Sequence, residues 1–249
     1  MRINLLGSEL DCLTFDQTIE SINEIIQSHT PTQHVVINAN KIIQMRKDKK
    51  LSRIINECRL INADGISIVL AAKILGYSNV ERVTGVDIFV KLLEVCSEKG
   101  YKVYFLGATE EVVQNVVKAS KHKHPDLTVA GYRNGYFKDE ESNEIAEAIK
   151  ESSADVLFVA FPSPQKEFWI KRHLQQMDVS FVMGVGGSFD VLSGNVKRAP
   201  QWVQKIGMEW FVRFIQEPRR MFKRYFLGNF TFLWLVYRER FSKKDKRQE

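Results

Sequence analysis

Residues 181–190, FVMGVGGSFD, join an apolar run to a glycine-rich turn. The apolar run predicts a buried strand, and the glycines allow backbone N–H groups to approach an anion. A helix that begins after the turn would add partial positive charge at its N-terminus. We therefore expect a strand, a phosphate-binding turn and a helix, in this order.

Further apolar runs alternate with amphipathic stretches along the chain. The runs predict strands at 35–38, 59–62, 102–106, 127–130 and 156–160, before the strand at 180–184. The amphipathic stretches predict helices at 15–28, 66–75, 85–99, 110–123, 139–152 and 164–177, and a capping box of Thr14 and Gln17 marks the start of the first. This alternation is typical of βαβ units. We predict an α/β, Rossmann-like fold, with a largely parallel sheet flanked by helices.

Polar or glycine residues follow five of the predicted strands. Ligands of open α/β sheets gather at the carboxyl ends of the strands, so these residues are candidates for one site. They are Asn38, Asn40, Asp64, Gly107, Thr109, Gln165, Gly184, Gly186, Gly187 and Ser188. Two glycine-rich turns on one edge indicate a nucleotide diphosphate. Neither turn carries the full dinucleotide-binding fingerprint with its acidic residue, which disfavours a dinucleotide-dependent oxidoreductase or epimerase.

Asp64 stands between a predicted strand and a predicted helix, in Asn62-Ala63-Asp64-Gly65. In a structural interpretation its carboxylate caps the helix and Gly65 eases the turn, and spacing alone favours this one. In a functional interpretation the carboxylate takes a proton from an incoming hydroxyl group.

Arg82 precedes a helix that we expect Thr84 to cap. Its guanidinium could form a surface ion pair with Glu81 or Asp87, which would contribute little stability. It could instead hold a diphosphate through two parallel hydrogen bonds. The sequence leaves both interpretations open.

Metal ligands are sparse in the sequence. No Asp-x-Asp pair occurs, and the histidines lack the spacing of a metal site. Cationic side chains would then balance a diphosphate, and we expect no metal and no cofactor. Cys12, Cys58 and Cys96 are widely spaced and odd in number, which predicts buried free thiols.

Charge divides the chain near residue 196. Residues 197–249 contain 14 Lys or Arg and 5 Asp or Glu, a net charge of +9, while residues 1–196 carry a net charge of −3. We predict an α/β core with a nucleotide pocket over 1–196 and a helical, basic and aromatic C-terminal appendage over 197–249.

The appendage interleaves aromatic and basic residues, which is typical of an interfacial helix. Each basic residue near an anionic membrane contributes about 1 kcal/mol to binding. Bulky apolar residues at 225–237 favour lipid over nucleic acid, but these 13 residues are fewer than the roughly 20 that a spanning helix needs. The N-terminus lacks the apolar segment of a signal peptide. We predict a cytoplasmic protein that is peripheral on the inner face of the cytoplasmic membrane. Residues 202–215 could instead pack on the sheet, and the apolar surface under the appendage could mediate self-association.

Four motifs together resemble the WecG/TagA/CpsF family of bacterial glycosyltransferases. They are Asn62-Ala63-Asp64-Gly65-Ile66, Glu81-Arg82-Val83-Thr84-Gly85, the stretch from Gly184 to Asp190, and the stretch from Lys197-Arg198-Ala199-Pro200 through Glu209-Trp210 to Gln216-Glu217-Pro218-Arg219-Arg220. They stand in the family's order and span nearly the whole chain.

The resemblance implies an inverting, metal-independent transfer of a hexose from a UDP-sugar to a polyprenyl-diphosphate-linked sugar, in polysaccharide or teichoic acid linkage-unit assembly. In the best-studied relatives the donor is UDP-N-acetylmannosamine and the acceptor is GlcNAc-diphospho-undecaprenol. By resemblance Asp64 is the general base, Asn40 lies near the acceptor or the donor sugar, and Arg82 contacts the donor. Substrate-binding roles fall by the same resemblance to Asn38, Lys166, Asp190, Arg213, Arg219, Arg220 and Arg224.

The chain departs twice from the pattern of many family members. Asn38-Ala39-Asn40 replaces Thr-Pro-Asn, and Pro164-Gln165-Lys166-Glu167 replaces Pro-Lys-Gln-Glu. The second change moves the glutamine one position along a helix, a rotation of about 100°. Other donors, such as UDP-glucose or UDP-N-acetylmannosaminuronic acid in capsule or exopolysaccharide synthesis, are therefore alternatives. A non-catalytic protein that binds a nucleotide or a lipid headgroup is a more distant one.

Overall fold

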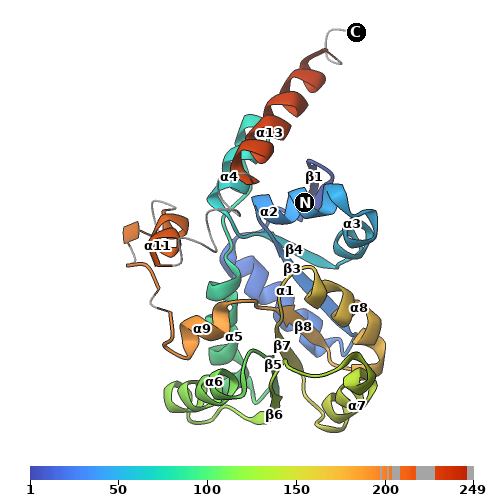
Figure 1. Cartoon of the computed structure of the whole chain (residues 1–249), viewed down its shortest axis with the longest axis vertical. Coiled ribbons are helices and arrows are strands. Elements are labelled where there is room, and N and C mark those ends of the chain that lie inside the picture. The colour runs from blue at the N-terminus through green and yellow to red at the C-terminus, as the bar shows by residue number, and fades with distance from the viewer. Residues whose placement is uncertain (197, 201, 204–207, 217–227, 246–249) are drawn as a thin grey trace.

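The protein is built on a six-stranded parallel sheet (Figure 1). The computed structural model describes residues 1–196, 198–200, 202–203, 208–216 and 228–245. The strands are β3 (Thr32–Ile37), β4 (Leu60–Ala63), β5 (Val103–Gly107), β6 (Val129–Arg133), β7 (Val156–Ala160) and β8 (Phe181–Gly184). Their order is β4-β3-β8-β7-β5-β6, and every neighbouring pair is parallel. All six lie on predicted runs, so the α/β fold with a parallel sheet is confirmed.

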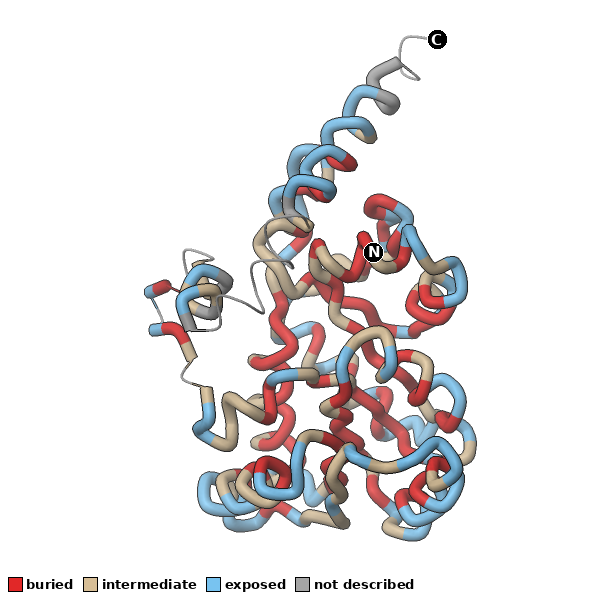
Figure 2. Tube along the Cα trace, in the orientation of Figure 1, coloured by how far each residue is buried: buried red, intermediate tan, exposed pale blue. Residues whose placement is uncertain are grey.

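Helices cover both faces of the sheet, which explains why the strands are continuous apolar runs rather than alternating ones. One face carries α1 (Phe15–Gln27), α5 (Gly85–Lys99), α6 (Glu110–Lys123) and α9 (Ser188–Leu192), packed with Phe105, Phe158 and Phe181 of the strands. The opposite face carries α7 (Ser142–Glu151) and α8 (Gln165–Met177), packed with Leu106, Leu157 and Val182. In Figure 2 the strands form the buried centre between these layers.

Predicted helix starts agree with the observed caps. Thr14 accepts a hydrogen bond from the Gln17 N–H in a complete capping box, and Thr84 accepts one from the Asp87 N–H. The helix predicted at 139–152 is divided into a 3₁₀ turn, η1 (Asp139–Glu141), and α7. Local hydrogen-bonding groups therefore fix where these helices begin.

Two helices that the apolar pattern did not predict follow β3. They are α2 (Ala39–Lys47) and α3 (Lys49–Asn56), which cover the β3–β4 end of the sheet with Ile37 and Ile61. Asp48 ends α2 and starts α3, because its carboxylate accepts the Lys50 and Leu51 N–H groups at 2.9 and 3.0 Å. One capping side chain thus divides a single polar stretch into two helices.

An N-terminal hairpin was also not predicted. Its strands, β1 (Arg2–Leu5) and β2 (Ser8–Asp11), are antiparallel and joined by Leu6 and Gly7, both at positive φ. The Asp11 carboxylate accepts a hydrogen bond from the Ile61 N–H at 2.8 Å, and this contact ties the hairpin to the edge strand β4.

The C-terminal part is helical, as predicted. It contains α11 (Glu209–Gln216) and α13 (Gly228–Asp245), and Figure 1 shows α13 beside α4 (Ile66–Ile74), projecting beyond the sheet. Phe232, Leu235 and Val236 of α13 are buried in one cluster with Ile42 and Ile43 of α2. One side of α13 is therefore anchored on α2. The division of the chain into a core and an appendage at residue 196 stays a prediction. Within the described ranges, no helix has the length and hydropathy to cross a bilayer.

The three cysteines are free. Cys58 and Cys96 are buried as predicted, and Cys12 is half-buried. Burial raises the pKa of the Cys58 thiol to about 12, and it also raises that of Cys96. These thiols are therefore protonated and unreactive near neutral pH.

Candidate active site at the carboxyl edge of the sheet

The carboxyl ends of four adjacent strands, β4, β3, β8 and β7, bring most of the candidate residues to one edge. Asp64 follows β4, Asn38 follows β3, Gly184 ends β8, and Lys166 lies just after β7. The loops after β3 and β4 touch, because a Cβ built on Gly65 would lie 3.6 Å from the Asn38 Cβ. The order of the strands therefore assembles residues that are far apart in the sequence.

Asp64 is half-buried and held by backbone groups. Its Oδ1 accepts a hydrogen bond at 3.1 Å from the N–H of Gly85, the first residue of α5, and its own N–H donates to the Ile37 carbonyl at 2.9 Å. The residue that caps α4 is Gly65, without a side-chain hydrogen bond, so the interpretation of Asp64 as that cap is wrong. The carboxylate instead faces the positive end of the α5 dipole.

Arg82 contacts the backbone of Asp64. Its Nε donates to the Asp64 carbonyl at 3.4 Å, and its Nη2 is 2.9 Å from Glu209 Oε2. Glu209 belongs to α11, so the ion-pair partner comes from the C-terminal part and not from the neighbours that the sequence suggested. Arg198 joins this group through Asp87 Oδ1 at 2.5 Å and Glu209 Oε1 at 3.7 Å.

Lys166 is the candidate that the structure places closest against the glycine-rich turn. A Cβ on Gly184 would lie 2.8 Å from Lys166 Cδ and Cε, and a Cβ on Gly186 would lie 3.7 Å from Lys166 Nζ. Glycine at 184 therefore makes room for the lysine stem. The neighbouring Gln165 is exposed at the first position of α8.

Lys166 belongs to a buried charge cluster that also contains Lys41 of α2 and Glu167 of α8. Lys41 Nζ forms an ion pair with Glu167 Oε1, Ser163 Oγ donates to Glu167 Oε2 at 3.0 Å, and Lys166 Nζ is 3.6 Å from Glu167 Oε1. Burial, reinforced by the charge of Lys41, lowers the pKa of Lys166 to about 8. Burial alone would raise the pKa of Glu167, but Lys41 and Lys166 outweigh it and hold that pKa below its usual value.

The turn after β8 joins a strand to a helix, as predicted, while its role in phosphate binding stays a prediction. Gly186 is at φ +53°, and Gly187 caps the short helix α9. Ser188 is buried, and its hydroxyl donates to the Val185 carbonyl at 2.9 Å, so it closes the turn internally. Asp190 lies in the same helix, with its Oδ2 facing Gly187.

In the second glycine-rich turn, after β5, local structure explains why residues 107 and 109 are glycine and threonine. Gly107 is at φ +124°, and a Cβ there would lie 2.8 Å from the backbone of Ala160 on β7. Thr109 caps α6 through a hydrogen bond from the Val112 N–H at 3.3 Å. A role of these two residues in ligand binding stays a prediction.

The remaining candidates are placed as follows. Asn38 caps α2 by accepting the Lys41 N–H at 3.1 Å, and Asn40 is half-buried in the first turn of that helix. Arg213 lies in α11, and its side chain is outside what the structure describes, while Arg219, Arg220 and Arg224 lie outside the described residues.

Four charged residues of the site were not predicted as site residues: Lys41, Glu167, Arg198 and Glu209. A signal existed for Glu167, because it shares the helical spacing of the buried residues Ile170 and Leu174. A carboxylate in an apolar stripe indicates a buried partner. Lys41 has no such signal, since it stands in the polar start of its helix. Glu209 stands between Met208 and Trp210, but its partner Arg82 is 127 positions away in the sequence.

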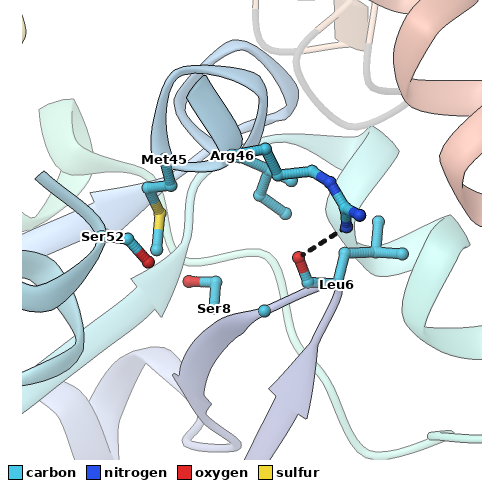
Figure 3. Close-up of a pocket in the computed structure, with 7 residues that line it drawn as sticks. Leu6, Ser8, Met45, Arg46 and Ser52 are labelled. Atoms are coloured by element: carbon cyan, nitrogen blue, oxygen red, sulfur yellow. Dashed lines mark hydrogen bonds between the residues drawn. The ribbon is translucent and has the colours of Figure 1, made fainter. Parts of the chain in front are cut away.

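A separate cavity of about 290 Å³ lies between the N-terminal hairpin and α2–α3 (Figure 3). Its lining includes Leu6, Ser8, Met45, Arg46 and Ser52, with Arg46 Nη1 donating to the Leu6 carbonyl at 3.4 Å. None of the candidate residues lines this cavity. Among the residues that the structure describes, no three His, Cys, Asp or Glu side chains gather as metal ligands would.

Comparison with known proteins gives relatives along most of the chain. An N-acetylglucosaminyldiphosphoundecaprenol N-acetyl-beta-D-mannosaminyltransferase of Bacillus spizizenii is 34% identical over 187 residues, 74% of this chain and 72% of the relative. A Staphylococcus aureus protein of the same name is 30% identical over 222 residues, 88% of this chain and 87% of the relative. The glycosyl transferase WecG/TagA/CpsF family matches residues 3–246, so this chain, with its Asp64–Arg82 edge and glycine-rich turn, belongs to that family of glycosyltransferases.

Proposed function

We propose that the protein transfers a hexose, with N-acetylmannosamine as the first candidate, from a UDP-sugar to a polyprenyl-diphosphate-linked sugar, with inversion and without a metal ion. The observation that carries the proposal is the Asp64 carboxylate, fixed by the Gly85 N–H at 3.1 Å beside a glycine-rich turn. The names of the relatives support the choice of sugar and of acceptor. UDP-glucose and UDP-N-acetylmannosaminuronic acid stay alternative donors.

The proposed chemistry is a single displacement. Asp64 removes the proton of the acceptor hydroxyl as its oxygen attacks the anomeric carbon from the face opposite UDP, so the anomeric configuration is inverted. The bond from that carbon to the diphosphate breaks, and the electron pair leaves with UDP. The backbone N–H groups of 184–188 and the guanidinium of Arg82 offset the charge that develops on the diphosphate.

The fixed orientation of Asp64 favours this role. A general base must hold one lone pair toward the hydroxyl it deprotonates, and the Gly85 hydrogen bond holds one of the two carboxylate oxygens in place. Asn38 and Asn40, at the start of α2, offer amide groups for sugar hydroxyls on the same edge.

We place the reaction at the inner face of the cytoplasmic membrane, where the acceptor lipid is found. Supporting this, the outer side of α13 exposes large apolar residues next to a basic C-terminal end. In the proposal, α13 lies on the anionic surface, and arginines of the appendage, Arg213, Arg219, Arg220 and Arg224, approach the diphosphate when the acceptor is present.

The direct test measures UDP release from a panel of UDP-sugars, with a GlcNAc-diphospho-lipid acceptor, for the wild type and Asp64→Asn. We expect release with one donor, reduced by at least about 100-fold in the variant, since a general base contributes roughly 10² to 10⁴ in rate. Release that persists in Asp64→Asn would remove the general-base role. UDP binding without release from any donor would favour the non-catalytic alternative.

Metal independence is tested separately. We expect EDTA to leave turnover unchanged, because cationic side chains and backbone N–H groups offset the diphosphate charge in this proposal. Loss of turnover that added Mg²⁺ restores would show that a divalent ion takes part.

A further inference from the structure

The cluster of Lys41, Lys166 and Glu167 has one more cationic group than anionic. The Glu167 side chain is 1% exposed, and those of Lys41 and Lys166 are 6% and 13% exposed. Glu167 uses Oε1 for Lys41 and Oε2 for the Ser163 hydroxyl. Lys166 Nζ stays at 3.6 Å from Glu167, beyond hydrogen-bond distance, so the carboxylate is committed to other partners.

The position of Lys166 is built into the fold. Its stem passes where a Cβ of Gly184 would be, and its ammonium lies against Gly186 at the carboxyl end of β8. Asp64, after β4, is near enough for its charge to raise the pKa of Lys166 against the stronger effects of burial and Lys41. The ammonium therefore lies against the glycine-rich turn, on the sheet edge that also carries Asp64.

A cation that is removed from water without a hydrogen-bonded counter-ion is costly to the fold. A ligand that brings anionic oxygen atoms to the turn would offset this cost and would find backbone N–H groups beside the ammonium. The arrangement thus favours an anionic ligand at the turn. An anionic group of the sugar donor is the candidate, because Asp64, the proposed base, lies at the same edge of the sheet.

We propose that the Lys166 ammonium binds an anionic oxygen of the donor substrate at the Gly184–Gly186 turn. This proposal rests on the proposed function. It adds a specific contact to the donor by Lys166, at a position where many family members have a glutamine. Two parts of a donor carry such an oxygen: the diphosphate of any UDP-sugar and the carboxylate of a sugar acid.

The test uses the full chain and isothermal titration calorimetry with four ligands: UMP, UDP, UDP-N-acetylmannosamine and UDP-N-acetylmannosaminuronic acid. The variants are Lys166→Gln, which removes the charge, and Lys166→Arg, which keeps it. Lys171→Gln is the matched control, because Lys171 is on the same helix but pairs with Glu57 at the surface.

A hydrogen bond to a charged group contributes enough for Lys166→Gln to weaken binding by about 10- to 100-fold. If the diphosphate is the partner, UDP and both UDP-sugars lose affinity alike and UMP loses less. If the sugar carboxylate is the partner, only the uronic acid donor loses affinity. Either pattern supports the proposal, provided that Lys171→Gln binds as the wild type does.

Binding of every ligand by Lys166→Gln within twofold of the wild type would overturn the proposal. Wild-type protein that binds no UDP would overturn the proposed function and this contact together. Should Lys166→Gln fail to fold, UDP affinity is compared between the wild type and Lys166→Arg above pH 8. In this range Lys166 loses its charge and an arginine at the same position keeps it. Equal loss of affinity in both proteins would then contradict the proposal.

Discussion

Gly184 shows how one missing side chain shapes the site. A Cβ at this position would come within 2.8 Å of Lys166 Cδ and Cε, but these atoms belong to a flexible stem rather than to backbone. We expect Gly184→Ala to displace the lysine, weakening UDP binding by about 10-fold or more through the lost charged contact, while the fold tolerates the change. Calorimetry with a parallel thermal melt checks this. An alanine variant that keeps wild-type affinity would show that the lysine does not need the space.

The charge of Lys166 gives ligand binding a pH dependence. Its pKa is lowered to about 8 in the folded protein, so the ammonium loses its proton as the pH rises above that value. An anion is bound by the protonated form. We therefore expect UDP affinity to be highest near pH 7 and to fall, above pH 8, by up to tenfold per pH unit.

The charged groups that face Lys166 are Lys41 on α2, Glu167 on α8 and Asp64 after β4. Lys166→Arg is the control for their contribution, because arginine keeps its charge through this range. Its affinity for UDP should stay level above pH 8. A decline of equal steepness in Lys166→Arg would assign the pH dependence to another group.

Among the helices, the contact between α2 and α8 depends on Glu167. Glu167→Gln leaves the buried Lys41 ammonium without its carboxylate, and loss of one partner from a buried ion pair typically costs about 3–5 kcal/mol. We expect a loss of this size in the free energy of unfolding, measured in urea. Glu57→Gln is the control, since Glu57 pairs with Lys171 of α8 at the surface and should cost about 1 kcal/mol or less.

The same carboxylate makes the fold sensitive to acid. Because the pKa of Glu167 is held below its usual 4.5, the unfolded chain takes up the proton first as the pH falls. The stability that Glu167 contributes is therefore present above pH 4.5 and is lost as the pH falls through its lower folded value. The unfolding free energy of Glu167→Gln should lack this part of the acid dependence.

The elements differ in how well the sequence predicts them. The central strands β5, β7 and β8 were found because they are buried on both sides and read as apolar runs. The hairpin and the α2–α3 pair were missed, since β1 and β2 alternate polar and apolar residues instead of forming apolar runs, and Asp48 interrupts a mostly polar stretch. Within the site, Asp64 and Lys166 stand in recognisable motifs. Their partners, the Gly85 N–H and Glu167, depend on which strands lie side by side.

At the scale of the whole molecule, α13 has one side that packs on the rest of the protein and one side that is exposed. Phe232, Leu235 and Val236 face α2 and α4, whereas Phe230, Leu233, Trp234, Tyr237 and Phe241 are 48–67% exposed. Arg238 lies 4.9 Å from the centre of the Trp234 ring, so a basic group accompanies the apolar side chains. This exposed side is the surface that we propose for membrane binding.

We expect the double variant Leu233→Ser, Trp234→Ser to lose most binding to phosphatidylglycerol vesicles while its melting temperature stays near that of the wild type. Phe232→Ala is the matched control on the buried side and should cost about 3–5 kcal/mol of stability. Sedimentation with vesicles measures the bound fraction. Unchanged sedimentation of the double variant would place the membrane contact elsewhere.

The ion pair between Arg82 and Glu209 links events at the two ends of the chain. It joins α11 to the guanidinium proposed to hold the donor, at 2.9 Å. A diphosphate that takes this guanidinium competes with Glu209, so donor binding and the docking of α11 are coupled equilibria. Coupling of this kind is reciprocal: by whatever factor the Glu209 contact weakens donor binding, bound donor weakens the Glu209 contact. Donor supply would then regulate how α11 docks on the site.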